Sequence, residues 1–150
     1  MRRAALTGGT GFLGRHVIRA LSDQGWSVRI LARSQPNLPE LSDVPIELVL
    51  GDLNDPEALK RLATGCDLYV HIAGVVKAAD RHGFMGPNRD GAARAAAAWA
   101  EVGHGRFILI SSMAAREPSL SDYAASKRAG EDAAAEALAG RDWRILRPGA

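Results

Sequence analysis

The sequence predicts a doubly wound α/β domain, a parallel sheet of six strands with helices on both faces. Short apolar runs alternate with segments of helical periodicity along the chain, which is the pattern of βαβ units. The runs are almost wholly apolar, as strands covered on both faces are. The first run leads into a glycine-rich turn that opens a helix. The length of 150 residues suits one such domain, so we expect residues 1–150 to form it. The predicted strands are residues 4–6, 28–32, 46–50, 68–72, 106–110 and 143–146.

The helices are predicted from spacing, caps and composition. Residues 12–24 place leucine, valine and alanine at helical spacing, and Gly25 is the expected C-terminal cap. Asp55 and Pro56 open a short helix that ends near Gly65, because Asp caps helices well and Pro fits the first helical position. Two further helices are expected over the alanine-rich stretch 88–102 and over 123–139, whereas residues 34–45, with three prolines, and 75–87 are expected to be irregular.

Composition and charge exclude several classes of function. The formal net charge is +2 and lysines and arginines never run beyond two in a row, so we expect no nucleic-acid partner. The apolar stretches all fall short of the roughly 20 residues of a membrane span, so we expect no membrane partner. Cys66 is the single cysteine and the four histidines lack metal-ligand spacing, so we expect neither a disulfide nor a metal site. The first residues lead into a strand rather than a signal peptide, and we expect a cytoplasmic protein.

The segment Thr7–Gly14 reads Thr-Gly-Gly-Thr-Gly-Phe-Leu-Gly and joins the first strand to the first helix. Its glycines fit both G-x-G-x-x-G and G-x-x-G-x-x-G. One glycine makes the turn, a second lets the backbone approach a pyrophosphate, and a third lets the helix pack on the strand. The helix N-terminus then stabilises the anion, although a tight structural turn is the alternative. The expected cofactor contacts here are Gly8, Gly9, Thr10, Gly11, Phe12, Leu13 and Gly14.

The end of the second strand indicates which dinucleotide binds. An Asp or Glu that would bind the adenosine ribose is missing there, and Arg33 stands in its place. A guanidinium suits a 2′-phosphate, so we expect NADP(H) to be preferred, with NAD(H) as the second option. The alternative is an exposed arginine at the sheet edge. After the third strand, Asp52 and Leu53 lie where an adenine would rest, and Asp52 either accepts a bond from the adenine amine or caps a turn.

Tyr123 and Lys127 lie four residues apart at the start of a predicted helix, and therefore on one face of it. A phenol is a poor acid–base partner at neutral pH, and an ammonium about 5 Å away favours the phenolate by roughly 3 kcal/mol at an effective dielectric of about 20. By itself this spacing is more typical of an ordinary helix. Ser111 and Ser112, however, follow the fifth strand, at the sheet edge where a hydroxyl can bond a substrate carbonyl or alcohol.

With these features together, the chain resembles the short-chain dehydrogenase/reductase superfamily, in the extended and atypical branch of NAD(P)-dependent epimerase/dehydratase-like proteins. The resemblance covers the whole chain and implies a Rossmann fold that binds NAD(P). The matching segments are Thr7–Gly14, Gly51–Leu53, His71–Gly74, Asn88–Gly91, Ser112, Tyr123, Lys127 and Arg147–Gly149.

The resemblance implies a role for each catalytic candidate. Tyr123 is the general acid/base, Ser112 rather than Ser111 polarises the substrate oxygen, and Lys127 holds the nicotinamide ribose and favours the phenolate. Asn88 supports Lys127 through a water.

The same resemblance implies that Ala73 and Gly74 pass near the cofactor. His71 is expected to be a packing residue at a strand end. Only ten residues separate Ser112 from Tyr123, fewer than extended members usually have.

The leading hypothesis is an NAD(P)-dependent oxidoreductase or epimerase/dehydratase-like enzyme that transfers hydride at a carbinol or carbonyl carbon. Its substrate would be a small carbonyl, alcohol or sugar nucleotide. The alternative is a non-catalytic NAD(P)-binding redox sensor or assembly module, although such relatives commonly lack the Tyr/Lys pair. The resemblance also allows a homodimer through the two last predicted helices. Members of the branch continue well beyond this length, so we expect the C-terminal substrate half to be absent here. We expect a protein that ends at Ala150 to bind NADP(H) but to turn substrates over poorly.

Overall fold

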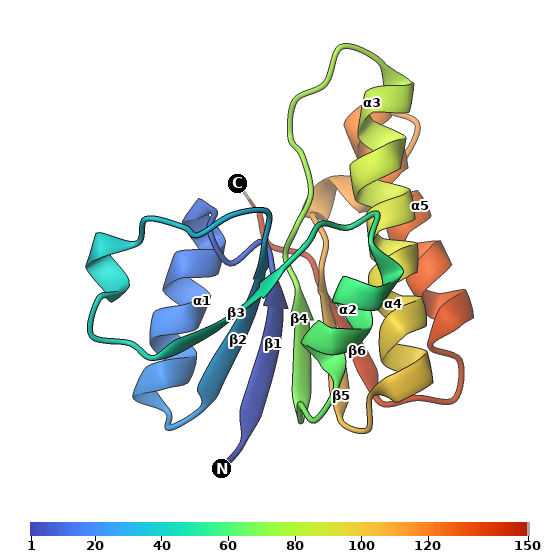
Figure 1. Ribbon diagram of the computed structural model, residues 1–150. Coiled ribbons are helices and arrows are strands. Elements are labelled where there is room, and N and C mark those ends of the chain that lie inside the picture. Colours follow the sequence, from blue (N-terminus) through green and yellow to red (C-terminus); the bar gives the residue numbers. More distant parts are fainter. Residues whose placement is uncertain (150) are drawn as a thin grey trace.

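The computed structural model describes residues 1–149 as a sheet with helices packed on both of its faces (Figure 1). Every adjacent pair of strands is parallel, and the strand order is β3-β2-β1-β4-β5-β6, which confirms the predicted doubly wound sheet. The order reverses between β1 and β4, and a ligand crevice is expected at the carboxyl ends of these strands. The strands are β1 (Arg3–Thr7), β2 (Ser27–Ala32), β3 (Ile46–Leu50), β4 (Leu68–His71), β5 (Arg106–Ile110) and β6 (Trp143–Leu146).

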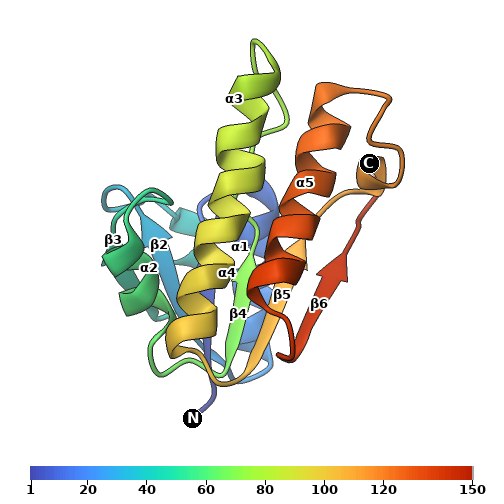
Figure 2. The same ribbon diagram turned by 90° about the vertical axis from the view of Figure 1, so that its right-hand side faces the viewer.

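The helices divide unequally between the two faces of the sheet. Helix α1 covers one face, and α2, α4 and α5 cover the other (Figure 1), with α4 and α5 side by side (Figure 2). The helices are α1 (Phe12–Asp23), α2 (Pro56–Ala63), α3 (Arg81–Met85), α4 (Gly91–Val102) and α5 (Asp122–Ala137). Shorter turns are the 3₁₀ segments Pro39–Leu41 and Met113–Arg116 and the π turn Gly86–Asp90.

The core consists of two apolar clusters, one on each face of the sheet. The cluster under α1 is aliphatic, whereas the larger one under α2, α4 and α5 has three aromatic rings at its centre. Tyr69 stacks on Phe107 at 5.0 Å between ring centroids, and Trp99 tilts against Tyr69 at 5.6 Å. The expectation that every strand is covered on both faces is wrong for β6, where Trp143 and Ile145 pack on the core while Arg144 and Leu146 are exposed. The other edge strand, β3, packs Ile46 and Leu48 on one cluster and Val49 on the other.

The segment expected to be irregular over 75–87 contains a helix, which corrects the sequence prediction. Asp80 caps α3 by accepting a hydrogen bond from the backbone N–H of Gly83 at 2.8 Å. Pro87 has no N–H to donate, and here the chain widens into the π turn before continuing as α4. This helix was not predicted because Gly83, Gly86 and Pro87 have low helix propensity. The capping residue Asp80 was nevertheless visible in the sequence.

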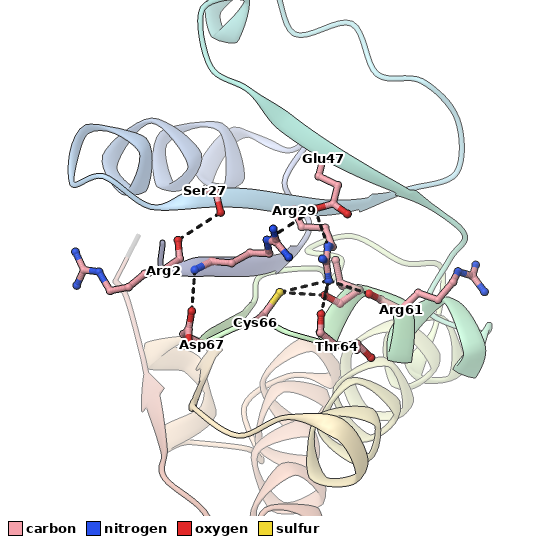
Figure 3. Close-up of polar contacts among 10 residues, drawn as sticks. Arg2, Ser27, Arg29, Glu47, Arg61, Thr64, Cys66 and Asp67 are labelled. Atoms are coloured by element: carbon pink, nitrogen blue, oxygen red, sulfur yellow. Dashed lines mark hydrogen bonds and ion pairs between the residues drawn. The ribbon is translucent and has the colours of Figure 1, made fainter.

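One buried charge interrupts the apolar strand β2. Arg29 is 7% exposed and reaches the C-terminal end of α2, where its Nη1 donates to the carbonyls of Arg61, Leu62 and Thr64 at 3.0, 3.0 and 2.7 Å (Figure 3). Its Nε lies 3.1 Å from a carboxylate oxygen of Glu47 on β3. Cations favour helix C-termini, so this side chain fixes α2 to the sheet.

Candidate active site

The glycine loop between β1 and α1 is shaped by close contacts. Gly8 has φ +69°, and a Cβ added to it would lie 2.6 Å from the backbone nitrogen of Ala73, so only glycine fits there. Gly14, on the first turn of α1, packs directly on the backbone of Gly8 and Gly9. A Cβ on Gly11 would meet only the carbonyl oxygen of Gly8, at 3.5 Å, which leaves the space beside it available to a ligand.

The N-terminus of α1 suits an anion. Gly11 caps the helix without a side-chain hydrogen bond, and the first turn has no acidic residue. Phe12 and Leu13 turn their side chains outward, and Phe12 is 84% exposed. Backbone N–H groups at such an end, together with the helix dipole, attract phosphate.

A cleft of about 770 Å³ opens beside this loop at the carboxyl end of the sheet. It brings together seven of the predicted cofactor residues, which are Gly8, Thr10, Arg33, Asp52, Leu53, Ala73 and Gly74. Five other predicted contacts, Gly9, Gly11, Phe12, Leu13 and Gly14, belong to the loop without lining the cleft, and Lys127 lies deeper. The cleft walls also include Asn37, Pro87 and Arg94, which were not predicted from the sequence.

Three side chains set the chemistry of the cleft at its β2–β3 side. Arg33 is exposed and has no hydrogen bond or ion pair with any other residue in 1–149. Arg15 is held, because it donates to the carbonyl of Thr10 at 3.0 Å and pairs with Glu40 at 2.7 Å. Asp52 accepts a bond from the backbone N–H of Asn54 at 2.8 Å, so it does cap a turn while lining the cleft.

The two serines after β5 have different partners. Ser111 is buried and donates to Glu131 at 2.6 Å, and Arg147 donates to the same carboxylate at 2.8 and 2.5 Å. Burial raises the pKa of Glu131, but the bonds from Arg147 and Ser111 outweigh it and hold that pKa below its ordinary value. Ser112 is half-buried, and its oxygen accepts a bond from the backbone N–H of Ala114 at 3.1 Å. Its hydroxyl proton has no acceptor among residues 1–149.

Helix α5 carries the predicted tyrosine and lysine one turn apart. Ser121 caps the helix by accepting from the backbone N–H of Ala124 at 3.0 Å, which positions Tyr123 in the first turn. Tyr123 is half-buried and meets the ring of Phe84 edge-on at 5.9 Å between centroids.

Lys127 runs inward from α5 to the end of β5. Its Nζ donates to the carbonyl of Ile110 at 3.3 Å, and a Cβ added to Gly74 would lie 3.6 Å from that nitrogen. Burial lowers the pKa of Lys127, and the nearby Glu131 opposes the shift only in part. The amine therefore lies beside Gly74, which is part of the cleft wall.

Asn88, in the π turn, holds the segment of this wall that follows β4. Its side-chain oxygen accepts from the N–H of Val75 at 2.8 Å, and its amide donates to the carbonyl of Val75 at 2.9 Å and to Ser126 at 3.0 Å. Both amide protons are therefore committed. The structure thus places Asn88 beside Gly74 and Lys127 and shows it holding the segment after β4.

Two negative findings apply to residues 1–149. These residues contain no group of three or more His, Cys, Asp or Glu side chains that could hold a metal ion. None of their helices is long and apolar enough to span a bilayer.

Comparison with known proteins gives consistent matches. The profile of a family described as NAD(P)H-binding matches residues 8–150. A ceramide reductase of Caulobacter vibrioides is 57% identical over 129 residues, which cover 86% of this chain and 40% of that protein. The chain therefore spans less than half the length of this curated relative.

Solved structures agree with the sequence matches. A protein described as a putative epimerase from Burkholderia cenocepacia superposes with a TM-score of 0.85 at 28% identity, over 99% of this chain and 54% of that one. A short-chain dehydrogenase/reductase superfamily protein from Agrobacterium tumefaciens, solved with bound NAD, gives a TM-score of 0.79 at 25% identity, over 97% and 48% of the two chains.

Proposed function

The chain belongs to the NAD(P)H-binding family within the short-chain dehydrogenase/reductase superfamily, and from this premise we propose that it forms the cofactor-binding part of a carbonyl reductase. The observation that carries the proposal is the position of Lys127, whose amine lies against Gly74 in the wall of the cleft, one helical turn from Tyr123. This arrangement joins a dinucleotide site to a phenol that can carry a proton.

The cleft fits a dinucleotide at both ends. The loop beside Gly11 leaves room for a pyrophosphate at the N-terminus of α1, and Asp52 and Leu53 offer a surface for an adenine. Arg33 supplies an uncommitted guanidinium at the ribose, where a carboxylate would select NAD(H). We therefore propose that NADP(H) is preferred. When bound, this cofactor supplies or accepts the hydride.

Tyr123 and Lys127 of α5, together with Ser112 after β5, act on the oxygen of the substrate. The Tyr123 hydroxyl donates its proton to the carbonyl oxygen during reduction, and the alcohol returns it in the reverse direction. Ser112 donates a hydrogen bond to the same oxygen, because its hydroxyl proton has no acceptor within residues 1–149 whereas that of Ser111 binds Glu131. The ammonium of Lys127 stabilises negative charge on the phenol oxygen and positions the ribose.

The surface beside Ser112 and Tyr123 favours an apolar substrate. Met113 and Leu120, in the connection from β5 to α5, are 46% and 77% exposed, and Leu146 at the end of β6 is 51% exposed. Exposed apolar side chains on the chain segments next to Ser112 and Tyr123 suit a lipid with one carbonyl group. Together with the similarity to a ceramide reductase, this supports a ketone on a ceramide-like lipid as the substrate.

The experiment follows NADPH oxidation by the purified protein with a ketone analogue of ceramide. Tyr123→Phe should cut turnover about 100-fold or more while leaving NADPH affinity within about twofold, since general acid–base steps contribute about 10²–10⁴-fold. Ser112→Ala should also lower turnover, whereas Ser111→Ala should lower thermal stability and change turnover less. Full activity of Tyr123→Phe would exclude this mechanism, and equal losses in the two serine variants would exclude the assigned role of Ser112.

A further inference from the structure

His71, at the end of β4, is a buried side chain whose two ring nitrogens have different surroundings. It is 2% exposed, and Nδ1 lies 2.7 Å from the hydroxyl oxygen of Thr7 on the neighbouring strand β1. Nε2 is fully buried and has no hydrogen-bond partner among residues 1–149. A buried polar atom without a partner is costly, so it points to a bound ligand.

The contacts of Thr7 decide which nitrogen of His71 carries the proton. The Thr7 hydroxyl oxygen accepts from the backbone N–H groups of Ile72 and Ala73 at 3.1 and 3.3 Å, and the Ile72 N–H is shared with the Thr7 carbonyl at 3.3 Å. These two bonds engage both lone pairs of the hydroxyl oxygen. Its own proton must therefore be donated to Nδ1 of His71. A neutral imidazole with Nδ1 as acceptor carries its proton on Nε2, so the unpartnered atom is a donor.

This donor belongs to a small cavity beneath the candidate active site. The cavity measures about 10 Å³ and is lined by His71, Asn88, Ser111 and Lys127 among others. That is close to the 10–15 Å³ or so that one water requires. Among its lining residues, His71 and Lys127 carry donors, and Ser111 and Asn88 each carry an oxygen with a lone pair that no residue of 1–149 uses.

We propose that His71 also binds the water that the family resemblance places between Asn88 and Lys127, and that this water lies in the cavity and bridges His71 to Lys127. The water accepts hydrogen bonds from His71 Nε2 and from the Lys127 ammonium and donates to Ser111 and Asn88. His71 is then a positioning residue for Lys127, oriented by Thr7 rather than merely packed. The binding of this water by His71 stands on the contacts alone, whereas its effect on turnover rests on the proposed function.

The charges around the site support a neutral His71. Burial and, to a smaller extent, the positive charge of Lys127 on α5 together lower the pKa of His71 to about 3. Glu131, also on α5, is the carboxylate that acts on Lys127, and it is paired with Arg147 after β6. His71 therefore keeps one tautomer through the neutral range, which lets it hold a water in a fixed orientation.

The first test reads the tautomer directly. NMR of ¹⁵N-histidine-labelled protein should show His71 with a protonated Nε2 and an unprotonated Nδ1, unchanged between pH 6 and 8 or so. Thr7→Val removes the proton donor to Nδ1 and should mix the two tautomers. A protonated Nδ1 in the unmodified protein would overturn the assignment.

The second test measures the pKa of Lys127 by NMR of its side-chain amine. In His71→Leu the water loses a donor and leaves, so the pKa of Lys127 should fall by about one pH unit, because the ammonium loses a solvating oxygen. His71→Gln keeps a donor near the position of Nε2 and should restore the value. His104→Leu, at an exposed histidine between α4 and β5, is the matched control and should change nothing.

The two results separate this inference from the proposed function. A pKa of Lys127 that is the same in His71→Leu, His71→Gln and the unmodified protein would overturn the bridging water. If that pKa falls as expected, the pH above which turnover declines should fall by the same amount. A shifted Lys127 with an unmoved profile would leave the water site in place and contradict the catalytic role of Lys127 instead. If His71→Leu does not fold, His71→Phe removes the same donor and takes its place in the comparison.

Discussion

Arg33 and Arg15 both line the cleft, but only one of them is available to a ligand. Arg15 is held by Thr10 and Glu40, whereas Arg33 has no partner within residues 1–149 and stands where an NAD-selective carboxylate would be. A free guanidinium has two parallel donors that match a phosphate. The identity of residue 33, rather than the overall charge of the cleft, should decide between the two cofactors.

Arg33→Asp should reverse or erase the preference for NADPH over NADH. The new carboxylate would repel a 2′-phosphate and accept bonds from a 2′-hydroxyl. Fluorescence titration with each cofactor measures the two affinities. Arg2→Asp makes the same charge change just before β1, at the amino end of the strand and away from the cleft. It should leave the ratio of the two cofactor affinities unaltered. Tighter binding of NADH than NADPH by the unmodified protein would contradict the assignment of Arg33.

At the scale of elements, α2 depends on a strand that is not its neighbour in sequence. Its C-terminal carbonyls are bonded by Arg29 of β2, and the same guanidinium contacts Glu47 of β3 and the buried thiol of Cys66 (Figure 3). Burial raises the pKa of that thiol, and Arg29 opposes the shift in part. The helix that follows the adenine-side residues Asp52 and Leu53 is therefore fixed by a charge in the sheet.

Arg29→Met should lower the free energy of unfolding by about 2–3 kcal/mol. The substitution keeps apolar volume but leaves helix carbonyls without their donor, and hydrogen bonds to charged groups contribute about 1.5–3 kcal/mol. Urea unfolding followed by circular dichroism measures the change. Arg61→Met removes an exposed arginine of α2 and should cost less than about 0.5 kcal/mol. Similar losses in both variants would mean that Arg29 has no special role.

For the whole molecule, buried titratable groups make acid the condition to which the fold is most sensitive. The pKa of His71 in the folded protein is about 3, below its ordinary 6.5. Between these two pH values the unfolded chain binds a proton at His71 and the folded protein does not. Glu131 also has a lowered pKa, so its stabilising contribution is present above the unfolded pKa and is lost as the pH falls through the folded one. Both groups therefore reduce stability in acid.

Stability should fall as the pH drops from about 6.5 toward 3, by about 1.4 kcal/mol per pH unit for each proton taken up on unfolding. Urea midpoints at pH 7 and at about pH 4.5 measure the slope. His71→Gln cannot take up that proton and should have a shallower slope, while His104→Gln should keep the slope of the unmodified protein. Parallel slopes in all three proteins would show that His71 does not carry the effect.

The fold class, the strand positions and the glycine loop could be predicted from the amino-acid sequence alone. These depend on local signals, because apolar runs, caps and glycines act over a few residues and a parallel sheet demands them. Local signals failed at α3, where two glycines and a proline hide a helix that Asp80 caps, and at the edge strand β6, whose burial depends on what lies beside it.

Only the tertiary structure decided how side chains distant in sequence share their hydrogen bonds. Ser111 donates to Glu131, whereas the proton of Ser112 has no acceptor among residues 1–149, a difference that two adjacent serines cannot reveal in a sequence. The tertiary structure pairs Thr7 with His71 and brings Lys127 to the same cavity, and it sends Arg29 to the end of α2. Hydrogen bonds act over about 3 Å, and that proximity exists only after the strands have taken the order β3-β2-β1-β4-β5-β6.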